Sequence, residues 1–552
     1  MVSKVYNSSP SISNMVQRIA VIGSGISGIS AAWLLVKDSE AKFDVVVYEH
    51  GEWVGGHAHT VELPSLDGTT KGTVDTGFIV CNPHTYPNFL NFLSQLNVSL
   101  VDSDMSFSVS KDRGVFEWAG DNIDTVFAQR SNILNPKMWR MICDTIQFNE
   151  QATDIAEAVD RDLFDQGTGK LKNVKSASEN DIFTGHPYAQ MTLAEFFEKN
   201  NYSKFFYESY IVPMTASVWS TPADMALDQF PLLTLVRFMR NHMLLQVHDR
   251  PKWKTVLNGS KTYIEAVLKV VKDVRLTTAA VSITRSKDPN TITSRSVTVH
   301  DSKGSIETYD HVIFACHTDQ ALKILGSEAS EGERKVLGVI RYITNRAVLH
   351  RDSSFMPIRR KAWASWNNLL DSTKSNAICL TYWMNRLQTF ITPDVYGDVF
   401  VTMNPMWEPA KDMILGEWYY DHPFYCNDTI ASQEALNSIQ GQYCTTYCGA
   451  WTNYGFHEDG LTSGLLAALS LGAPCPFPVV LNGGYATHRL PPTPPAWASA
   501  RGVLRYTPAM PTHLAKTARR EYTLLTFISP AWIIMYRLSI VIMRLLSNLP
   551  FV

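Results

Sequence analysis

Charged residues are scarce in this chain. Asp, Glu, Lys and Arg make up 18% of its 552 residues, and the net charge is −3, whereas soluble domains average about 25% charged residues. Because there is no positive excess and no basic stripe, we expect no nucleic-acid partner. The low charge content indicates additional buried or membrane-facing surface.

Other common signatures are also missing. The eight cysteines contain no Cys-x-x-Cys pair and are too few for a disulfide framework in a chain of this length. The first stretch, MVSKVYNSSPSISNMVQ, has no apolar segment of the secretory type, so we predict a cytosolic, reducing compartment. No internal repeat is present, and the length predicts about two to four domain-sized units.

A strand–helix–strand pattern opens the informative part of the chain. Residues 18–23 (RIAVIG) form a short apolar run ending in glycine, which is typical of a buried parallel strand. The stretch ISGISAAWLLVK has helical spacing, and FDVVVYE at 43–49 is a second apolar run. This order predicts a βαβ unit.

The turn inside this unit has the spacing of a dinucleotide-binding site. Gly23 permits a tight turn, Gly25 lets the backbone approach a pyrophosphate, and Gly28 lets the helix pack on the strand. The helix N-terminus offers unpaired N–H groups to the phosphates. Glu49, at the end of the second strand, is placed to accept hydrogen bonds from ribose hydroxyls.

Two histidines, His57 and His59, follow the pair Gly55–Gly56. Histidines two residues apart on a strand point to one face, so a metal site is one interpretation. However, no third His or Cys lies at ligand spacing. We therefore predict no metal, and favour a backbone opened by the glycines so that a large cofactor can lie against it.

These motifs resemble the flavin-containing amine oxidoreductase superfamily. Its second motif reads glutamate, five residues, Gly-Gly-Arg, two residues, Ser or Thr, and here it reads Glu49, five residues, Gly55-Gly56-His57, two residues, Thr60. More narrowly, VGGHAHT, VDTGFIVCN and YGFHEDGLTSGL are similar to the signatures of a group of FAD-binding oxidoreductases within it. The resemblance covers about residues 18–470. It departs at His57, which replaces the arginine that helps bind the cofactor phosphates in relatives.

The resemblance implies non-covalent FAD as the cofactor. The Gly449 region would pass the ribityl chain, the backbone of Val281 would contact the adenine, and amides at Asp459, Gly460 and Leu461 would open a helix beneath the flavin ring. Glu458 and Asp459 could equally be capping residues, and Cys448 could be proposed for covalent attachment. The predicted cofactor contacts are Gly23, Ser24, Gly25, Ile26, Ser27, Gly28, Glu49, His50, Gly55, Gly56, His57, Thr60, Gly77, Phe78, Val281, Gly449, Glu458, Asp459, Gly460 and Leu461.

Candidates for catalysis are fewer. Many relatives carry a lysine on a strand of the second domain, but the comparable stretch here, YITNRAVLHRD, has Arg346 and His350 instead. Tyr382 and Trp383 could line a substrate pocket or belong to the core of a sheet. We name Arg346, Tyr382 and Trp383 as candidate catalytic residues, and interpret Cys316 and His317 as structural.

The end of the chain is apolar from Ala531 to Leu549 but contains Arg537 and Arg544. Two arginines argue against a membrane-spanning helix. We expect an amphipathic helix that lies in the membrane interface, with a packed C-terminal helix or an oligomer contact as the alternative. This predicts peripheral membrane association of a cytoplasmic protein.

We therefore predict an α/β fold with a discontinuous, Rossmann-type FAD-binding domain and a mixed-sheet, helix-covered substrate domain, amine-oxidase-like in type. The expected units are a flexible N-terminus (1–17), the FAD-binding domain (18–110, 255–325 and 436–472), the helical part (111–254) and the sheet (326–435) of the substrate domain, a Pro-rich linker (473–526) and an amphipathic helix (527–552).

The predicted function is redox chemistry on a lipophilic small molecule, with hydride transfer to the flavin. The apolar composition and the aromatic-rich second domain favour a lipophilic substrate. Two alternatives remain open at this point: an FAD-dependent carbon–carbon double-bond isomerase without net oxidation, and an inert FAD-folded scaffold.

Overall fold

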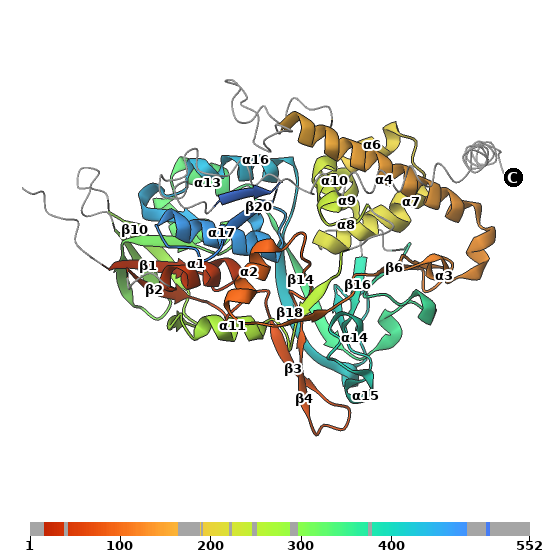
Figure 1. Ribbon diagram of the computed structural model, residues 1–552, viewed down its shortest axis with the longest axis horizontal. Coiled ribbons are helices and arrows are strands. Elements are labelled where there is room, and N and C mark those ends of the chain that lie inside the picture. The colour runs from red at the N-terminus through yellow and green to blue at the C-terminus, as the bar shows by residue number, and fades with distance from the viewer. Residues whose placement is uncertain are drawn as a thin grey trace, which may run out of the picture.

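The computed structural model describes residues 16–37, 42–163, 188, 191–219, 223–245, 251–286, 296–373, 378–482 and 504–507. It contains two domains, a three-layer domain on the left of Figure 1 and a second domain on the right, where helices lie above a sheet. The two are connected by several crossings of the chain. The predicted amphipathic helix at 527–552 lies outside the described residues.

A five-stranded parallel sheet forms the centre of the first domain, with the strand order β19-β13-β1-β2-β9. On β1, Ile19 lies between His311 and Val45 on the two neighbouring strands. The strands come from three distant parts of the sequence, which confirms the predicted discontinuous α/β domain. They are β1 (Gln17–Ile22), β2 (Phe43–Tyr48), β9 (Asp273–Arg275), β13 (His311–Phe314) and β19 (Thr445–Tyr447).

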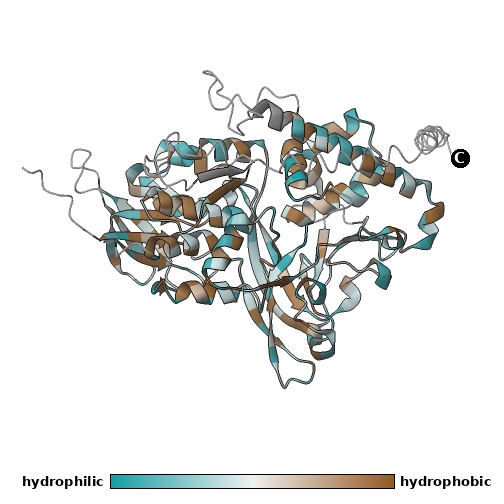
Figure 2. Ribbon diagram, viewed as in Figure 1, coloured by the Kyte–Doolittle hydropathy of each residue, from teal (hydrophilic) through white to brown (hydrophobic). Residues whose placement is uncertain are grey.

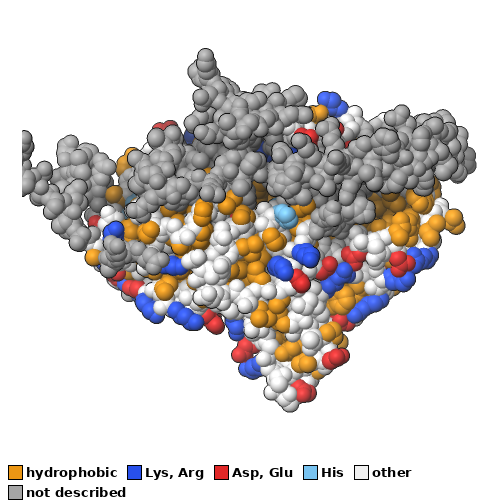
Figure 3. Space-filling model, viewed as in Figure 1, with side chains coloured by type: hydrophobic (Ala, Val, Ile, Leu, Met, Phe, Trp, Pro, Cys, Tyr) orange, Lys and Arg blue, Asp and Glu red, His pale blue; other side chains and the backbone are white. Residues whose placement is uncertain are grey.

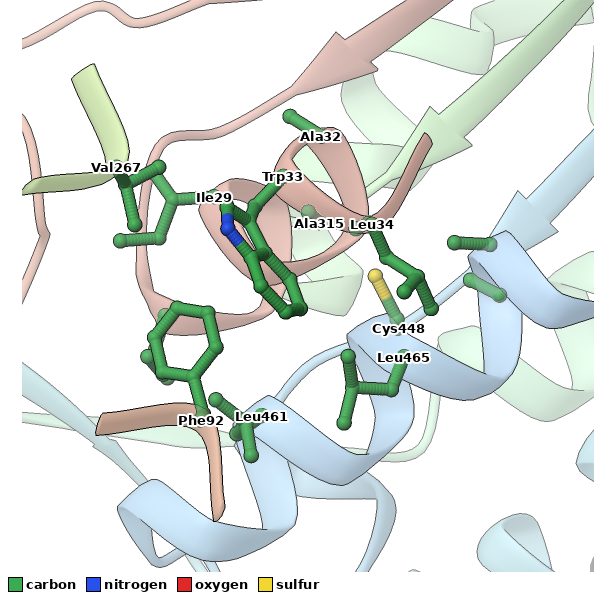
Figure 4. Close-up of a cluster of buried hydrophobic side chains, with 14 of the residues drawn as sticks. Ile29, Ala32, Trp33, Leu34, Phe92, Val267, Ala315, Cys448, Leu461 and Leu465 are labelled. Carbon is green, nitrogen blue, oxygen red and sulfur yellow. The ribbon is translucent and has the colours of Figure 1, made fainter. Parts of the chain in front are cut away.

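Both faces of this sheet are buried, which is why its strands appear in the sequence as continuous apolar runs. Val21 of β1 packs against helices, whereas the next residue, Ile22, packs against a small antiparallel sheet. Figure 4 shows the helical side, where Trp33 lies near Phe92 and Leu461. The helices are α1 (Ile26–Val36), α2 (Pro87–Gln95), α11 (Lys261–Leu268) and α17 (His457–Ser470), and the small sheet is β10 (Ala280–Arg285), β11 (Val297–Asp301) and β12 (Ile306–Tyr309).

The stretch 273–285 divides between two sheets. β9 belongs to the parallel sheet and β10 to the small antiparallel sheet. Between them Thr277 has a φ of 48°, and the amides of Thr277 and Thr278 donate to the carbonyls of Gly51 and Glu49. The chain therefore turns around the carboxyl end of β2.

A seven-stranded mixed sheet forms the base of the second domain, with the order β18-β14-β17-β16-β15-β6-β7. Its pairings are antiparallel except that β15 and β6 are parallel. The strands are β6 (Phe107–Lys111), β7 (Phe116–Ala119), β14 (Tyr342–His350), β15 (Trp366–Leu370), β16 (Ile378–Trp383), β17 (Phe400–Met403) and β18 (Ile414–Pro423).

Helices cover this sheet, as predicted for a mixed-sheet, helix-covered substrate domain. The longest is α4 (Pro136–Leu163), on which Met141, Phe148, Ala152 and Ile155 are buried at the three- and four-residue spacing of one helix face. Figure 2 shows teal and brown alternating along this helix. The others are α6 (Leu193–Lys199), α7 (Lys204–Phe206), the π-helix η2 (Tyr207–Ile211), α8 (Val212–Trp219), α9 (Ala223–Asp228) and α10 (Leu232–Asn241).

Short elements complete the described chain. β3 (Thr60–Pro64) and β4 (Lys71–Asp75) form a hairpin at the bottom of Figure 1, and β5 (Leu100–Asp102) pairs with β8 (Lys254–Val256). Within the stretch predicted as a Pro-rich linker, β20 (Val479–Asn482) pairs in parallel with β21 (Leu504–Thr507). The remaining helices used below are α12 (Thr318–Leu325) and α13 (Glu331–Leu337).

None of the described helices is long and apolar enough to cross a membrane. On the face shown in Figure 3, outside its grey areas, Lys and Arg side chains alternate with Asp and Glu along the lower edges. The chain has nearly equal numbers of the two kinds, 49 Lys and Arg against 52 Asp and Glu.

Candidate functional site

The glycine turn between β1 and α1 leaves open space in front of the helix. A Cβ added to Gly28 would lie 1.9 Å from the carbonyl oxygen of Gly23, so this glycine is needed for the helix to pack on the turn. A Cβ added to Gly25 would meet no atom within 4 Å. Gly25 is the N-cap of α1, and no side chain caps the first turn of this helix. The N–H groups of that turn can therefore bind a phosphate. Such a cradle fits the diphosphate of a dinucleotide.

Glu49 faces this turn as an ionised acceptor. The amide and hydroxyl of Ser24 donate to its Oε2 at 2.9 and 2.6 Å, and the amide of Gly51 donates to Oε1 at 2.7 Å. His50 Nδ1 lies 3.0 Å from Oε1. Although burial opposes ionisation, these hydrogen bonds lower the pKa of Glu49 to about 2. Glu49 is therefore a carboxylate at the position expected to receive ribose hydroxyls.

The second glycine pair packs directly against the first motif. The amide of Gly55 donates to the carbonyl of Ser24 at 3.1 Å, and a Cβ added to Gly56 would lie 3.1 Å from the Cα of Gly25. Gly77 passes equally close to the same segment, because its added Cβ would lie 2.2 Å from the carbonyl oxygen of His57. The motifs around residues 25, 55 and 77 thus form one continuous surface.

His57 and His59 both turn toward β18, on the second domain. His57 meets the edge of the Tyr420 ring at 5.1 Å and stacks on His422 at 5.2 Å. His59 Nδ1 lies 2.9 Å from the hydroxyl of Tyr420, and its ring stacks on Trp53. Within the described ranges, no group of three or more His, Cys, Asp or Glu side chains is placed to hold a metal ion.

Helix α17 packs closely against α1. Its close approach depends on Gly460 and Gly464, whose added Cβ atoms would lie 2.7 Å from Ile26 and 2.1 Å from the carbonyl of Ser27. Ile26 and Ser27 are thereby buried between the helices. The amide of Gly460 donates to the carbonyl of Phe456 at 3.0 Å, as the first hydrogen bond of the helix.

The acidic residues of α17 are capping residues. Glu458 accepts from the amides of Asn88 and Phe89 at 2.9 and 2.8 Å, at the start of α2, and burial raises its pKa to about 8. Asp459 accepts from the amide of Phe456 and from the side chain of Asn453. Both carboxyls therefore have the capping role that was the alternative interpretation, and the contact of this helix start with the flavin stays a prediction.

Leu461 and Cys448 also belong to the core. Figure 4 shows Leu461 near Trp33 and Phe92, and Cys448 near Leu34 and Leu465. Both side chains are fully buried, and burial raises the pKa of the Cys448 thiol. These side chains are part of the core, so a contact of Leu461 with the cofactor stays a prediction for its backbone amide, and the Cys448 thiol is held among apolar side chains.

Thr60 closes a buried network instead of contacting the site. Its hydroxyl donates to Asp75 at 2.5 Å and accepts from the amide of Lys261 at 2.8 Å. Asp75 also accepts from Ser260 and Gln388. Thr60 thus joins the β3–β4 hairpin to the start of α11, which corrects its assignment to the cofactor.

Three other predicted contacts remain near the site. The pairing of β10 with β11 shifts register between Ala280 and Ser282, so Val281 has no partner in that ladder and is exposed. The amide of Gly449 donates to Ser463 at 2.9 Å. Phe78 stacks on His457, at the start of α17, at 3.8 Å.

The three catalytic candidates lie on opposite faces of the seven-stranded sheet, Tyr382 on one face and Arg346 and Trp383 on the other. Tyr382 shares a face with Trp366 and Val401, and this inner face carries Tyr420 and His422, which contact His57. Arg346 and Trp383 lie on the outer face. Arg346 pairs with Glu408 and Glu417 at 2.7 and 2.8 Å, and Trp383 donates to Asp398. Arg346 and Trp383 are thus wrongly predicted, because alternate strand residues point to opposite faces.

Replacing Arg346 with alanine should leave the rate of flavin reduction within about twofold of the wild type. Its ion pairs are partly exposed, so we expect a loss of stability below about 1 kcal/mol. Stopped-flow absorbance and thermal unfolding measure both quantities. A tenfold slower reduction would return Arg346 to the reaction.

Several residues of the inner face were missed from the sequence. Trp366 and Tyr382 meet edge to face at 5.0 Å, and the buried indole N–H of Trp366 has no acceptor in the described part of the chain. His422 Nδ1 lies 3.0 Å from the side-chain amide of Asn345. Alternation of residues along each strand was the available signal, but it does not say which face points inward.

Known proteins resemble this chain in sequence and in fold. Residues 26–387 match a family model described as flavin containing amine oxidoreductase. Similar solved structures are a CLA-producing fatty acid isomerase from P. acnes (13% identity, TM-score 0.55, 84% of this chain and 99% of that chain) and cyclohexylamine oxidase from Brevibacterium oxydans IH-35A (14%, 0.55, 83% and 99%). A third is putrescine oxidase bound to putrescine (12%, 0.57, 83% and 100%). At these identities the likeness is one of fold. No curated protein sequence matches the chain.

Proposed function

The chain belongs to the flavin containing amine oxidoreductase family, and from this premise we propose that it binds FAD non-covalently and uses it to move a hydride to or from a lipophilic small molecule. The family places a flavin in this fold. When bound, the flavin supplies the hydride acceptor. The protein contributes binding, orientation and the exclusion of water.

Three features support FAD over a smaller flavin. The space in front of Gly25 admits a diphosphate, the first turn of α1 has free N–H groups, and the ionised Glu49 lies where a ribose would end. A cofactor without the adenosine diphosphate would leave all three unused. The buried position of Cys448 supports non-covalent binding.

The proposal of a lipophilic substrate is based on the inner face of the seven-stranded sheet, the face that contains Tyr382, Tyr420 and His422. On β14 to β18, the described inner-face positions include Asn345, Trp366, Tyr382, Trp418 and Tyr420, and none is Asp, Glu, Lys or Arg. Such a surface buries apolar groups and offers a few polar atoms for orientation. An ammonium substrate would find no carboxylate there.

The indole N–H of Trp366 provides one such polar atom. Because it is buried without an acceptor, a substrate oxygen placed against it would satisfy a hydrogen bond that is otherwise unmade. The hydroxyl of Tyr382 lies on the same face, where burial raises its pKa, so it stays protonated. Both groups would orient the polar end of the molecule.

Replacing Trp366 with phenylalanine should therefore lower kcat/KM about fivefold to tenfold for linoleic acid, through the loss of one hydrogen bond. Anaerobic bleaching of the flavin or the formation of a conjugated diene measures the rate. Trp383→Phe is the matched control, since that indole donates to Asp398 on the outer face. Faster reaction of a long-chain primary amine than of linoleic acid would overturn the lipophilic proposal.

The same site supports double-bond isomerisation as a second candidate. One similar structure is named a fatty acid isomerase, and the described inner-face positions of β14 to β18 include no lysine. An isomerase returns the hydride to the same molecule, whereas an oxidase needs an electron acceptor. Product formation from linoleic acid without oxygen or another acceptor would select the isomerase, and strict dependence on an acceptor would select the oxidase.

A further inference from the structure

We infer that three histidines, His57, His317 and His422, together bind the diphosphate of the cofactor in place of the arginine of the second motif. His57 and His317 provide counter-charge, and His422 provides a neutral N–H donor. The inference rests on the proposed binding of FAD and assigns the residues that recognise its phosphates. It also predicts that FAD binding, unlike the binding of a flavin without phosphates, takes up protons.

The glycine turn lies between the segments that carry two of these histidines. On one side is Gly56, where an added Cβ would lie 3.1 Å from the Cα of Gly25. His57 is the next residue along the chain. On the other side, a Cβ added to Gly23 would lie 2.6 Å from the carbonyl of Ala315, two residues before His317. Both histidines therefore flank the open space in front of α1.

The second domain contributes His422 to the same place. Its ring stacks on His57 at 5.2 Å. Asn345 Nδ2 donates to His422 Nδ1 at 3.0 Å while Asn345 Oδ1 accepts from Asn404, so the proton of the neutral ring is on Nε2. The Nε2–H is then available as a donor, and no acceptor for it is found in the described chain.

His317 is held in a similar way. It is the N-cap residue of α12, and its ring stacks on Tyr342 at 4.2 Å. Tyr342 is the first residue of β14, next to the end of β18 that carries His422. All three rings are thus fixed by ring contacts around one opening, as expected for a prearranged binding site.

The electrostatic surroundings favour a site that is neutral until an anion enters. Burial lowers the pKa of all three histidines, to about 4 for His422. The groups that face them are His50, His457, Asp319 and Asp421 from the neighbouring elements, and none of these is Lys or Arg. A diphosphate would reverse the balance at His57 and His317, because nearby negative charge favours the protonated ring. His422 would stay neutral and donate from Nε2, since its Nδ1 accepts from Asn345.

The test is a titration of the flavin-free protein with FAD and with riboflavin between pH 6 and pH 9 at constant ionic strength, followed by flavin fluorescence. The Kd for FAD should rise with pH, by up to about tenfold per pH unit for each proton taken up. The Kd for riboflavin should change little, because riboflavin has no phosphate. An equal pH dependence of both ligands would overturn the inference.

Variants test whether the histidines cause the pH dependence of FAD binding. His57→Arg should tighten FAD binding at pH 8 and reduce its pH dependence by about one proton, since arginine stays charged. His422→Ala should weaken FAD binding but not riboflavin binding. His300→Ala, on the small antiparallel sheet, is the control and should change neither. Glu49→Gln should weaken FAD binding at every pH without changing the slope, because the pKa of Glu49 lies near 2.

Two results contradict different proposals. If wild-type protein binds FAD with no pH dependence, or His57→Arg keeps the full slope, the histidine assignment fails while the proposed cofactor stands. If neither flavin binds at any pH, the proposed function itself fails.

Discussion

In a Gly25→Val variant the Kd for FAD is expected to rise at least about 100-fold, while the fold stays intact. The reason is that no protein atom lies within 4 Å of an added Cβ, so the side chain would occupy only the space proposed for the diphosphate. The backbone at Gly25 has a φ of −59° and a ψ of 175°, a conformation that valine adopts without strain. Flavin fluorescence gives the Kd, and thermal unfolding of the flavin-free protein checks the fold.

Gly120→Val is the matched control, because the nearest atoms to its added Cβ are at 3.6 Å and it lies on the second domain. It should bind FAD like the wild type. A Gly25→Val protein that keeps its yellow colour and its wild-type Kd would mean that the cofactor lies elsewhere. A variant that unfolds at a lower temperature without flavin would instead show that the space is filled by the protein itself.

An Asp75→Ala variant is expected to lose about 3 kcal/mol or more of the free energy of unfolding, the largest stability effect that we predict. Asp75 is 1% exposed and accepts from the Thr60 hydroxyl, the Ser260 amide and hydroxyl, and the Gln388 side chain. Alanine would leave these donors buried without an acceptor, which costs about 1–3 kcal/mol for each unsatisfied group. Denaturant unfolding of the flavin-free protein measures the loss.

Asp67→Ala is the appropriate comparison. Asp67 accepts from Ser65 and from the amide and hydroxyl of Thr69 in the tip of the same hairpin, but these groups remain in contact with water when the carboxylate is removed. Its effect should be clearly smaller than that of Asp75→Ala. Equal losses for the two variants would show that burial of the network is not what makes Asp75 important.

The glycine turn, Glu49 and the second glycine pair could be predicted from the sequence, and so could the α/β class. Each of these features depends on neighbouring residues: a turn, a helix N-terminus and a close backbone approach are set by which residues follow one another. The continuous apolar runs of β1 and β2 likewise reveal a sheet buried on both faces. Such local features need no knowledge of distant partners.

The roles of most side chains were decided by the tertiary structure. Thr60 meets Lys261, Glu458 meets Asn88, and Arg346 meets Glu408, and no spacing in the sequence connects these residues. Which face of a strand points inward depends on what packs against it, so Tyr382 and Trp383 were equivalent until the sheet was placed. His422 reaches His57 only because β18 ends beside the glycine turn. The sequence by itself determined the backbone that can receive the cofactor. The packing of the two domains determined which side chains face it, because those contacts join residues far apart in the sequence.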